Sequence, residues 1–288
     1  MNKGGPHVCA PIYSELRAQA VRLAFLEQGS LMLNWIAISL SQHATKYFLP
    51  RQRYFFASGQ QVIPILLAEL AKLIPHYSLG FIHQDDTYQP VVLTGLGGGQ
   101  NLYVNHDGKW LASYVPAFLR SHPFRLLTNE NNNLVFCIHE EHLVDNTQGR
   151  PLFDQEGNLT EPVQETLNFL NECENNRKVN QAAGQALYKA GVIEKWPLQI
   201  QQQEGQEPLK VEGLYRISEQ SLNELDAPTF AGLRKSGALA LAYAQLFSMN
   251  QINRFTELAK YHAKQRPPQP EEIDWGEDDR LWIDWDKL

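Results

Sequence analysis

Apolar positions in the first fifty residues have the spacing of amphipathic helices. Apolar side chains recur three or four positions apart over residues 12–26 and again over residues 30–48. Gly29 separates the two stretches, and Ser30 has the hydroxyl group that suits a helix N-cap. The pattern therefore predicts a helical pair that ends at Pro50.

The next stretch predicts one more helix and then a sheet. Residues 63–74 have helical spacing, with Pro64 in the first turn and Pro75 just after the last. From Tyr77 onward the helical spacing stops. Short runs of β-branched and aromatic residues follow, bounded by Gly, Pro, Asn or Asp, which is typical of strands. The predicted strands are residues 78–82, 91–96, 102–106, 110–113 and 134–138.

Asp107-Gly108 marks a hairpin between two of these strands. A two-residue type I′ turn needs positive φ at both central positions, and Asp-Gly is a pair that accepts it. Residues 114–120 predict one or two helical turns, after which Ser121-His122-Pro123 turns the chain.

The second half of the chain is mainly helical. A turn at residues 154–157 precedes a long helix that begins at Thr160 and ends near Ala190, with Gly191 as its C-terminal stop. Residues 211–225 read as a strand followed by a helix capped at Ser218, and further helices cover residues 228–235 and 237–265.

The order of these elements predicts an α+β fold, with a mostly antiparallel sheet flanked by helices. We divide the chain into an N-terminal helical extension (residues 1–50), one main domain (51–265) and a tail (266–288). The tail begins with a stiff Pro-rich linker and continues as an acidic segment that contains Trp275, Trp282 and Trp285.

The charge is unevenly distributed. The formal net charge is −7, and residues 266–288 account for −5 of it, with eight acidic and three basic residues. No basic stripe that could neutralise phosphates is present, which argues against nucleic acid as a partner. Acidic residues interleaved with tryptophans are typical of a segment that anchors on a protein partner, the alternative being that the tail docks on its own body.

Cysteine usage and hydropathy favour the cytoplasm. The three cysteines are far apart and form no Cys-x-x-Cys pair. Residues 1–11 lack the apolar core of a secretory signal, and the most apolar run, residues 31–40, has about ten residues where a membrane span needs ~20. We therefore expect a cytoplasmic protein without a membrane span, and export to the cell surface by an uncleaved C-terminal signal stays open.

The glycine-rich stretch does not match a nucleotide-binding loop. Gly95, Gly97, Gly98 and Gly99 are followed by Gln100 and a β run, not by a helix N-terminus that would hold a phosphate. We interpret them as a turn between strands.

One combination of residues resembles a metal site. His83 and Asp85 form a His-x-Asp pair, and His139 or His142 could complete the facial triad of a non-haem iron oxygenase. The alternative is that all of these are solvated loop residues, in which case no cofactor is needed.

Arg120 is the residue that best suits ligand binding. Its guanidinium could bind a carboxylate or phosphate at two points, or instead form a salt bridge to Asp107 or Asp154. The side chains that we expect to line a pocket here are Tyr103, Trp110, Tyr114, Arg120 and His122. Cys137 lies inside an apolar strand, where burial makes a thiol unreactive, and no Gly-x-Ser-x-Gly nucleophile elbow is present.

Several of these blocks together resemble the SapC family of bacterial proteins, over about residues 54–262. The most specific block is Tyr114-Val115-Pro116 with Leu119-Arg120. The other blocks that carry the resemblance are Gly95-Leu96, Gly99 to Val104, Asp107 to Trp110, Pro123-Phe124, residues 152–160, residues 213–225 and residues 233–252. The resemblance implies a link to bacterial surface layers and genes next to tryptophan-halogenase-like flavoproteins and outer-membrane receptors. It supplies no catalytic residues.

We therefore expect a non-catalytic accessory or scaffold protein that binds a protein partner through its α+β body and its acidic Trp-rich tail. Two alternatives stay open. One is an iron-dependent oxygenase that uses the triad above, and the other is a carrier of an indole or peptide substrate at Arg120 for a halogenase-like flavoenzyme.

Overall fold

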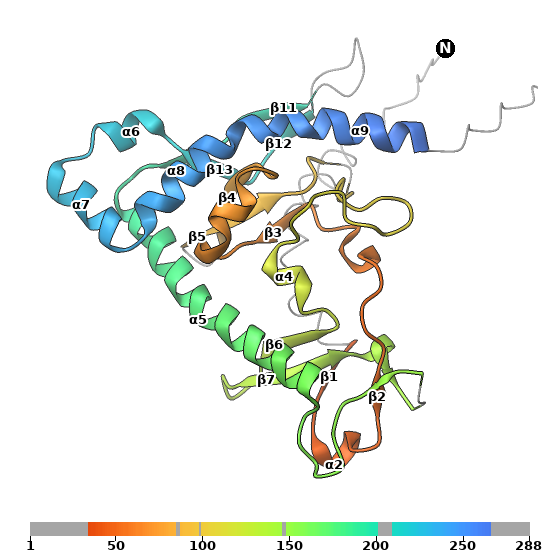
Figure 1. Cartoon of the computed structure of the whole chain (residues 1–288). Helices are drawn as coiled ribbons and strands as arrows, with labels where there is room; N and C mark the ends of the chain where they lie inside the picture. The colour runs from red at the N-terminus through yellow and green to blue at the C-terminus, as the bar shows by residue number, and fades with distance from the viewer. Residues whose placement is uncertain (1–33, 85–86, 98, 146–147, 201–208, 266–288) are drawn as a thin grey trace, which may run out of the picture.

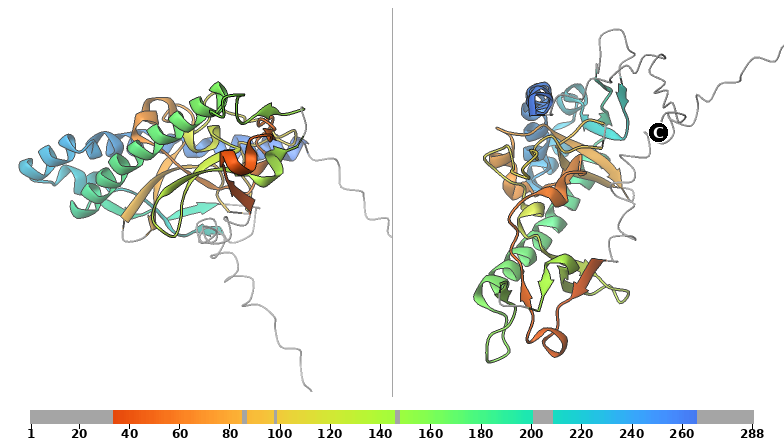
Figure 2. Two further views of the ribbon diagram at one scale, coloured as in Figure 1. Left: turned by 90° about the horizontal axis from the view of Figure 1, so that it is seen from below. Right: turned by 90° about the vertical axis from the view of Figure 1, so that its right-hand side faces the viewer.

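Two groups of strands, each with its own hydrophobic core, make up the chain, and one long helix runs along both (Figure 1). The computed structural model describes residues 34–84, 87–97, 99–145, 148–200 and 209–265. We call the two parts the larger lobe and the smaller lobe, and Figure 2 shows them one above the other in its right-hand view.

The larger lobe contains a five-stranded antiparallel sheet. The strand order is β10 (Ile193–Lys195), β13 (Leu214–Ile217), β4 (Leu79–Gln84), β5 (Thr87–Leu93) and β3 (Val62–Pro64). Strands β4 and β5 form the central hairpin, in which Leu79 is paired with Val92 and Gln84 with Thr87. A separate two-stranded ribbon joins β11 (Leu198–Ile200) to β12 (Leu209–Val211).

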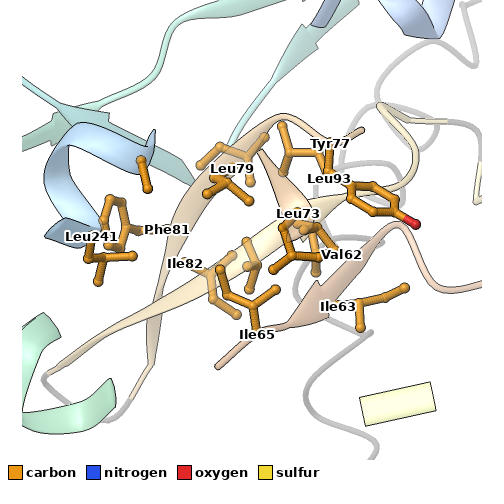
Figure 3. Close-up of a cluster of buried hydrophobic side chains, with 14 of the residues drawn as sticks. Val62, Ile63, Ile65, Leu73, Tyr77, Leu79, Phe81, Ile82, Leu93 and Leu241 are labelled. Carbon is orange, nitrogen blue, oxygen red and sulfur yellow. The ribbon is translucent and has the colours of Figure 1, made fainter. Parts of the chain in front are cut away.

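Helices cover the sheet of the larger lobe. They are η2 (Phe55–Ala57), η3 (Leu67–Glu69), α3 (Leu70–Leu73), α6 (Glu219–Asn223), α7 (Ala227–Lys235), α8 (Ala238–Ser248), η5 (Met249–Asn253) and α9 (Arg254–Gln265). Figure 3 shows the core between helices and sheet, where Leu73, Phe81 and Leu241 are among the fully or almost fully buried side chains. Burial of these apolar side chains is the main source of the lobe's stability.

The smaller lobe contains two three-stranded antiparallel sheets. One has the order β1 (Trp35–Ala37), β7 (Leu134–His139) and β6 (Phe124–Thr128), and the other has the order β8 (Leu143–Val144), β2 (Tyr47–Phe48) and β9 (Arg150–Pro151). Its short helices are α2 (Leu40–His43) and η4 (Glu140–His142). Helix α4 (Ala117–Arg120) lies between the two lobes, with Leu119 buried in the core of the larger lobe. The buried core of this lobe consists of Phe48, Phe124, Ile138, Leu152 and Val163.

Helix α5 (Glu161–Lys189) connects the two cores. It begins after Thr160 and ends at Ala190, where Gly191 has a φ of +68°. Val163, near its start, is buried in the smaller lobe, whereas Ala183 and Leu187, near its end, are buried in the larger lobe. Both boundaries match the helix that the sequence predicts, and the α+β fold with antiparallel sheets is confirmed.

The predicted helix over residues 30–48 is wrong in its described part. Residues 35–37 form β1, which pairs with β7, and Tyr47 and Phe48 form β2 between β8 and β9. Only Leu40–His43 is helical. The backbone pairs here with strands about one hundred residues further along the chain, and this tertiary pairing outweighs a local helical spacing. The predicted helix over residues 12–26 lies outside the described residues.

Two further predictions need correction. The helix expected over residues 63–74 starts only at Leu67, because Val62–Pro64 is strand β3, paired with β5 at the sheet edge where a proline is tolerated. The strands expected around Asp107-Gly108 make a single bridge, Val104 to Trp110. Of the two turn residues only Gly108 has positive φ, so the turn is not of type I′.

Strand β6, which the sequence did not suggest, pairs with β7.

Candidate binding site around helix α4

Helix α4, between the two lobes in Figure 1, is held in place by a buried carboxylate. Glu69, only 4% exposed, accepts hydrogen bonds through Oε1 from the Tyr114 hydroxyl (2.8 Å) and the Ala117 amide (2.6 Å). Its Oε2 accepts a third from the Leu66 amide at 3.0 Å. One side chain thus satisfies three donors and joins the start of η3 to the start of α4.

Hydrogen bonds from buried aromatic side chains also hold the segment that leads into α4. Trp110 Nε1 donates to the Tyr77 hydroxyl at 2.7 Å, and Tyr77 donates to the Tyr114 carbonyl. The Tyr103 hydroxyl donates to the carbonyl of His76 at 2.8 Å. Burial raises the pKa of Tyr77 and of Tyr103, and burial together with Glu69 raises the pKa of Tyr114 to about 12, so these hydroxyls stay protonated at neutral pH. Tyr103 is fully buried and therefore lies beneath the surface that it was expected to line.

Arg120 is exposed and lies against two aromatic rings. Its guanidinium carbon is 5.5 Å from the centre of the Tyr114 ring and 4.8 Å from that of Phe169, on α5. Its NH2 group donates to the Tyr114 hydroxyl at 3.3 Å. In the part of the chain that the structure describes, no carboxylate lies within 4.0 Å of it, so the expected salt bridge to Asp107 or Asp154 is not formed.

Three more cations surround α4 in the same way. Arg125 lies between the rings of Trp35 (5.0 Å) and Phe118 (4.8 Å), and Lys72 lies 5.6 Å from the Tyr114 ring. Arg51 stacks on Tyr54 and donates from NH1 to the carbonyls of Leu119 and Arg120. None of the four forms an ion pair with a described carboxylate. We define the α4 surface as Arg51, Lys72, Phe118, Arg120, Arg125 and Phe169.

A cluster of three histidines lies next to this surface, where the two lobes meet. His142 Nδ1 is 2.7 Å from the Leu49 carbonyl, which can only accept, so Nδ1 carries a proton. In its neutral form His142 then accepts at Nε2, and His122 donates to it from its own Nε2 at 3.2 Å. His122 also stacks on Phe56 with 3.8 Å between ring centres. The pair therefore connects η4, the residues before β6 and the chain before η2.

Burial disfavours the charged form of His122 and of His139. It lowers the pKa of His122 to about 3, with His142, His139 and two arginines acting in the same direction. Burial also lowers the pKa of His139, whose Nδ1 has no hydrogen-bond partner. No carboxylate among the described residues forms an ion pair with His122, so nothing in this part of the chain would compensate the cost of burying its positive charge.

We expect the free energy of unfolding to fall by about 2 kcal/mol between pH 7 and pH 5 through His122 alone. Below about pH 6.5 the unfolded chain binds a proton at His122, whereas the folded chain does not until about pH 3. Stability is therefore fully present above pH 6.5 and is lost as the pH falls through this window. Urea denaturation at both pH values measures the loss. His122→Phe, which retains the stacking on Phe56, should reduce it, and an unchanged pH dependence in this variant would contradict the assignment.

The histidines of the predicted iron triad do not come together. His83 is on β4 in the larger lobe, with its ring 4.9 Å from Tyr88 and 6.3 Å from Tyr215, whereas His139 and His142 belong to the smaller lobe. Asp85 lies outside the described residues. Across the described ranges, no three His, Cys, Asp or Glu side chains are arranged to hold a metal ion.

The glycine-rich stretch uses its backbone amides internally. The amide of Gly95 donates to the Gln61 carbonyl at 3.1 Å, and that of Gly97 donates to Gln61 Oε1 at 2.7 Å. Gly97 and Gly99 have positive φ. Both observations favour the interpretation as a turn. Gly98 lies outside the described residues, as do Trp275, Trp282 and Trp285 of the tail.

The sequence analysis proposed one pocket lining, made of Tyr103, Trp110, Tyr114, Arg120 and His122. The structure brings Tyr114 and Arg120 into contact, whereas Trp110 bonds to Tyr77 and His122 bonds to His142. Glu69, Arg51 and Arg125 are far from Arg120 in the sequence or face it from another element.

Comparison with known proteins gives one match. The model of the SapC family, described simply as SapC, matches residues 38–255 and so covers most of the chain, beginning before the stretch on which the sequence resemblance rests. No curated protein and no solved structure shows a significant match. None of the helices in the described residues has both the length and the apolar character needed to cross a membrane.

Proposed function

This chain belongs to the SapC family, and from that premise we propose that it is a non-catalytic accessory protein that binds a protein partner. The α4 surface is the part of the body that makes the contact, and the acidic Trp-rich tail supplies further anchors. The free thiols of Cys137 and Cys173 fit a reducing compartment, so we place this activity in the cytoplasm.

The observation that carries the proposal is the combination of exposed apolar and unpaired cationic groups on the α4 surface. Phe118 is 42% exposed in the middle of a four-residue helix. The Arg125 guanidinium lies on the Phe118 ring, and the Arg120 guanidinium lies on the rings of Tyr114 and Phe169. Neither has a carboxylate partner among the described residues. Aromatic and arginine side chains are the residues that contribute most to binding at protein interfaces.

The buried ionisable groups nearby have structural roles, which fits a binding protein. The Glu69 carboxylate accepts hydrogen bonds from three donors of its own chain. The two ring nitrogens of His142 form hydrogen bonds with the Leu49 carbonyl and with His122. Burial raises the pKa of the Cys137 and Cys173 thiols, which leaves little reactive thiolate at neutral pH.

We expect Phe118→Ser to weaken binding to the partner at least tenfold, since truncating a central aromatic anchor removes about 2 kcal/mol of binding free energy. The full chain, tagged and crosslinked in native cells, identifies the partner, and titration with the purified partner then gives the Kd. Phe247→Ser is the matched control, because Phe247 is 69% exposed on α8. Equal Kd values for the wild type and Phe118→Ser would refute the α4 surface as the contact.

A further inference from the structure

We propose that the chain's own acidic segment, residues 271–286, occupies the α4 surface in the free protein. The inference rests on the proposed function in one respect, namely that the α4 surface is also where the partner binds. The tail would then shield this surface, and a partner would have to displace it.

The first argument is charge complementarity. Residues 266–288 have a net charge of −5, whereas the rest of the chain has −2. The α4 surface collects four cationic side chains, Arg51, Lys72, Arg120 and Arg125, and none is paired with a carboxylate in the described residues. Opposite charges at contact distance attract each other appreciably even near the protein surface.

The second argument is the geometry of the arginines. A guanidinium that lies on an aromatic face directs its N–H groups outward, along its edges, where they can bind a carboxylate at two points. Arg120 is held between Tyr114 and Phe169, and Arg125 is held between Trp35 and Phe118. Of their N–H groups, only NH2 of Arg120 makes a hydrogen bond within the described chain. Arg120 is exposed, so the edge of its guanidinium is available to an incoming acid, whereas Arg125 is largely buried, and burial lowers its pKa.

The third argument is the order of residues in the tail. Trp275 follows Asp274, and Trp285 lies between Asp284 and Asp286. A tryptophan that packs against exposed Phe118 would bring its neighbouring carboxylates close to Arg125, whose guanidinium lies on the Phe118 ring. The segment thus matches the α4 surface in both its apolar and its charged groups.

The tail is long enough to reach the surface. Helix α9 ends at Gln265, and His262 on this helix lies 2.8 Å from the Leu102 carbonyl. Leu102 is followed by Tyr103, whose ring stacks on Trp110. Trp110 donates to the Tyr77 hydroxyl, which donates to the backbone carbonyl of Tyr114, and the Tyr114 hydroxyl accepts from Arg120. The nine residues from 266 to 274 span about 30 Å when extended, and Trp282 and Trp285 lie further along.

Photocrosslinking in the full chain tests the inference. With p-benzoylphenylalanine in place of Trp282, we expect irradiation to crosslink the tail to the peptides that contain Phe118, Arg120 and Phe169, as identified by mass spectrometry. Mixing isotope-labelled and unlabelled chains distinguishes crosslinks within one chain from those between copies. Arg120→Glu should lower the yield at least threefold, and 0.5 M NaCl should also lower it because salt screens exposed charges.

Lys235→Glu, at the exposed end of α7, makes the same charge change away from the α4 surface and should leave the yield unchanged. Crosslinks to other elements, crosslinks only between copies, or equal yields for Arg120→Glu and Lys235→Glu would each overturn the inference. If the inference fails while Phe118→Ser still weakens partner binding, the proposed function stands without self-occupation by the tail.

Discussion

Replacing Glu69 with alanine is expected to lower the free energy of unfolding by about 4 kcal/mol. The substitution leaves the amides of Leu66 and Ala117 and the hydroxyl of Tyr114 without their acceptor. Each buried donor that loses its partner costs about 1–3 kcal/mol, and removal of the buried carboxylate offsets part of this cost. Urea denaturation at pH 7, followed by circular dichroism, measures the change.

Two variants serve as controls for Glu69. Glu69→Gln retains one acceptor oxygen but turns an NH2 group toward a donor, so about half of the loss is expected. Glu165→Ala removes an exposed carboxylate from α5 and should change the stability by less than about 0.5 kcal/mol. If Glu69→Ala lowered the free energy of unfolding no more than Glu165→Ala does, the position of α4 would not depend on the Glu69 carboxylate.

A methyl group at Gly184 is the second change with a large expected effect. A Cβ atom there would lie 2.2 Å from the carbonyl oxygen of Tyr88, on the backbone of β5. Neither helix α5 nor the central strand can move aside without disturbing the core, so we expect Gly184→Ala to cost about 3 kcal/mol. Thermal and urea unfolding of the purified variant test this expectation.

Gly232→Ala is the matched control for Gly184. Gly232 is also helical, in α7, but a Cβ atom there has no atom within 4 Å. Alanine forms helices better than glycine, so this variant should gain up to about 1 kcal/mol. A loss at Gly232 similar to that at Gly184 would show that the cost does not come from the contact with β5.

Local signals in the sequence predicted the elements that depend on local chemistry. Gly191, with its positive φ, follows the end of α5, where the sequence predicted the stop. Thr160 stands at the N-cap position as predicted, but its hydroxyl donates to the Pro151 carbonyl and makes no cap hydrogen bond. Ser218 caps α6 and accepts from the amide of Ser221, as its position before a helical stretch suggested.

Elements that depend on distant pairing were not predictable in this way. The spacing of Ile36 and Leu40 fits a helix equally well, yet Ile36 pairs with Ile138 in a strand. Nothing near Ile36 in the sequence encodes that partner, and a hydrophobic period alone cannot distinguish a short buried strand from a helix.

The same limit applies to the candidate site. Tyr114 and Arg120 are six residues apart, so the sequence suggested their contact. Phe169 lies on α5, and Glu69 reaches Tyr114 across 45 positions, so only the folded chain brings them to α4. The sequence therefore indicated where the surface lies but not that its cations rest on aromatic rings.

Helix α5 sets a limit on how this protein can be divided. Its 29 residues extend roughly 43 Å, and its two ends complete different cores. The strands of the larger lobe lie both before α5 (β3, β4 and β5) and after it (β10 and β13), and strands of the smaller lobe come between them in the sequence. No single cut in the chain therefore separates the two lobes. Neither lobe is a continuous segment that could be expressed alone, even though each has a core of its own.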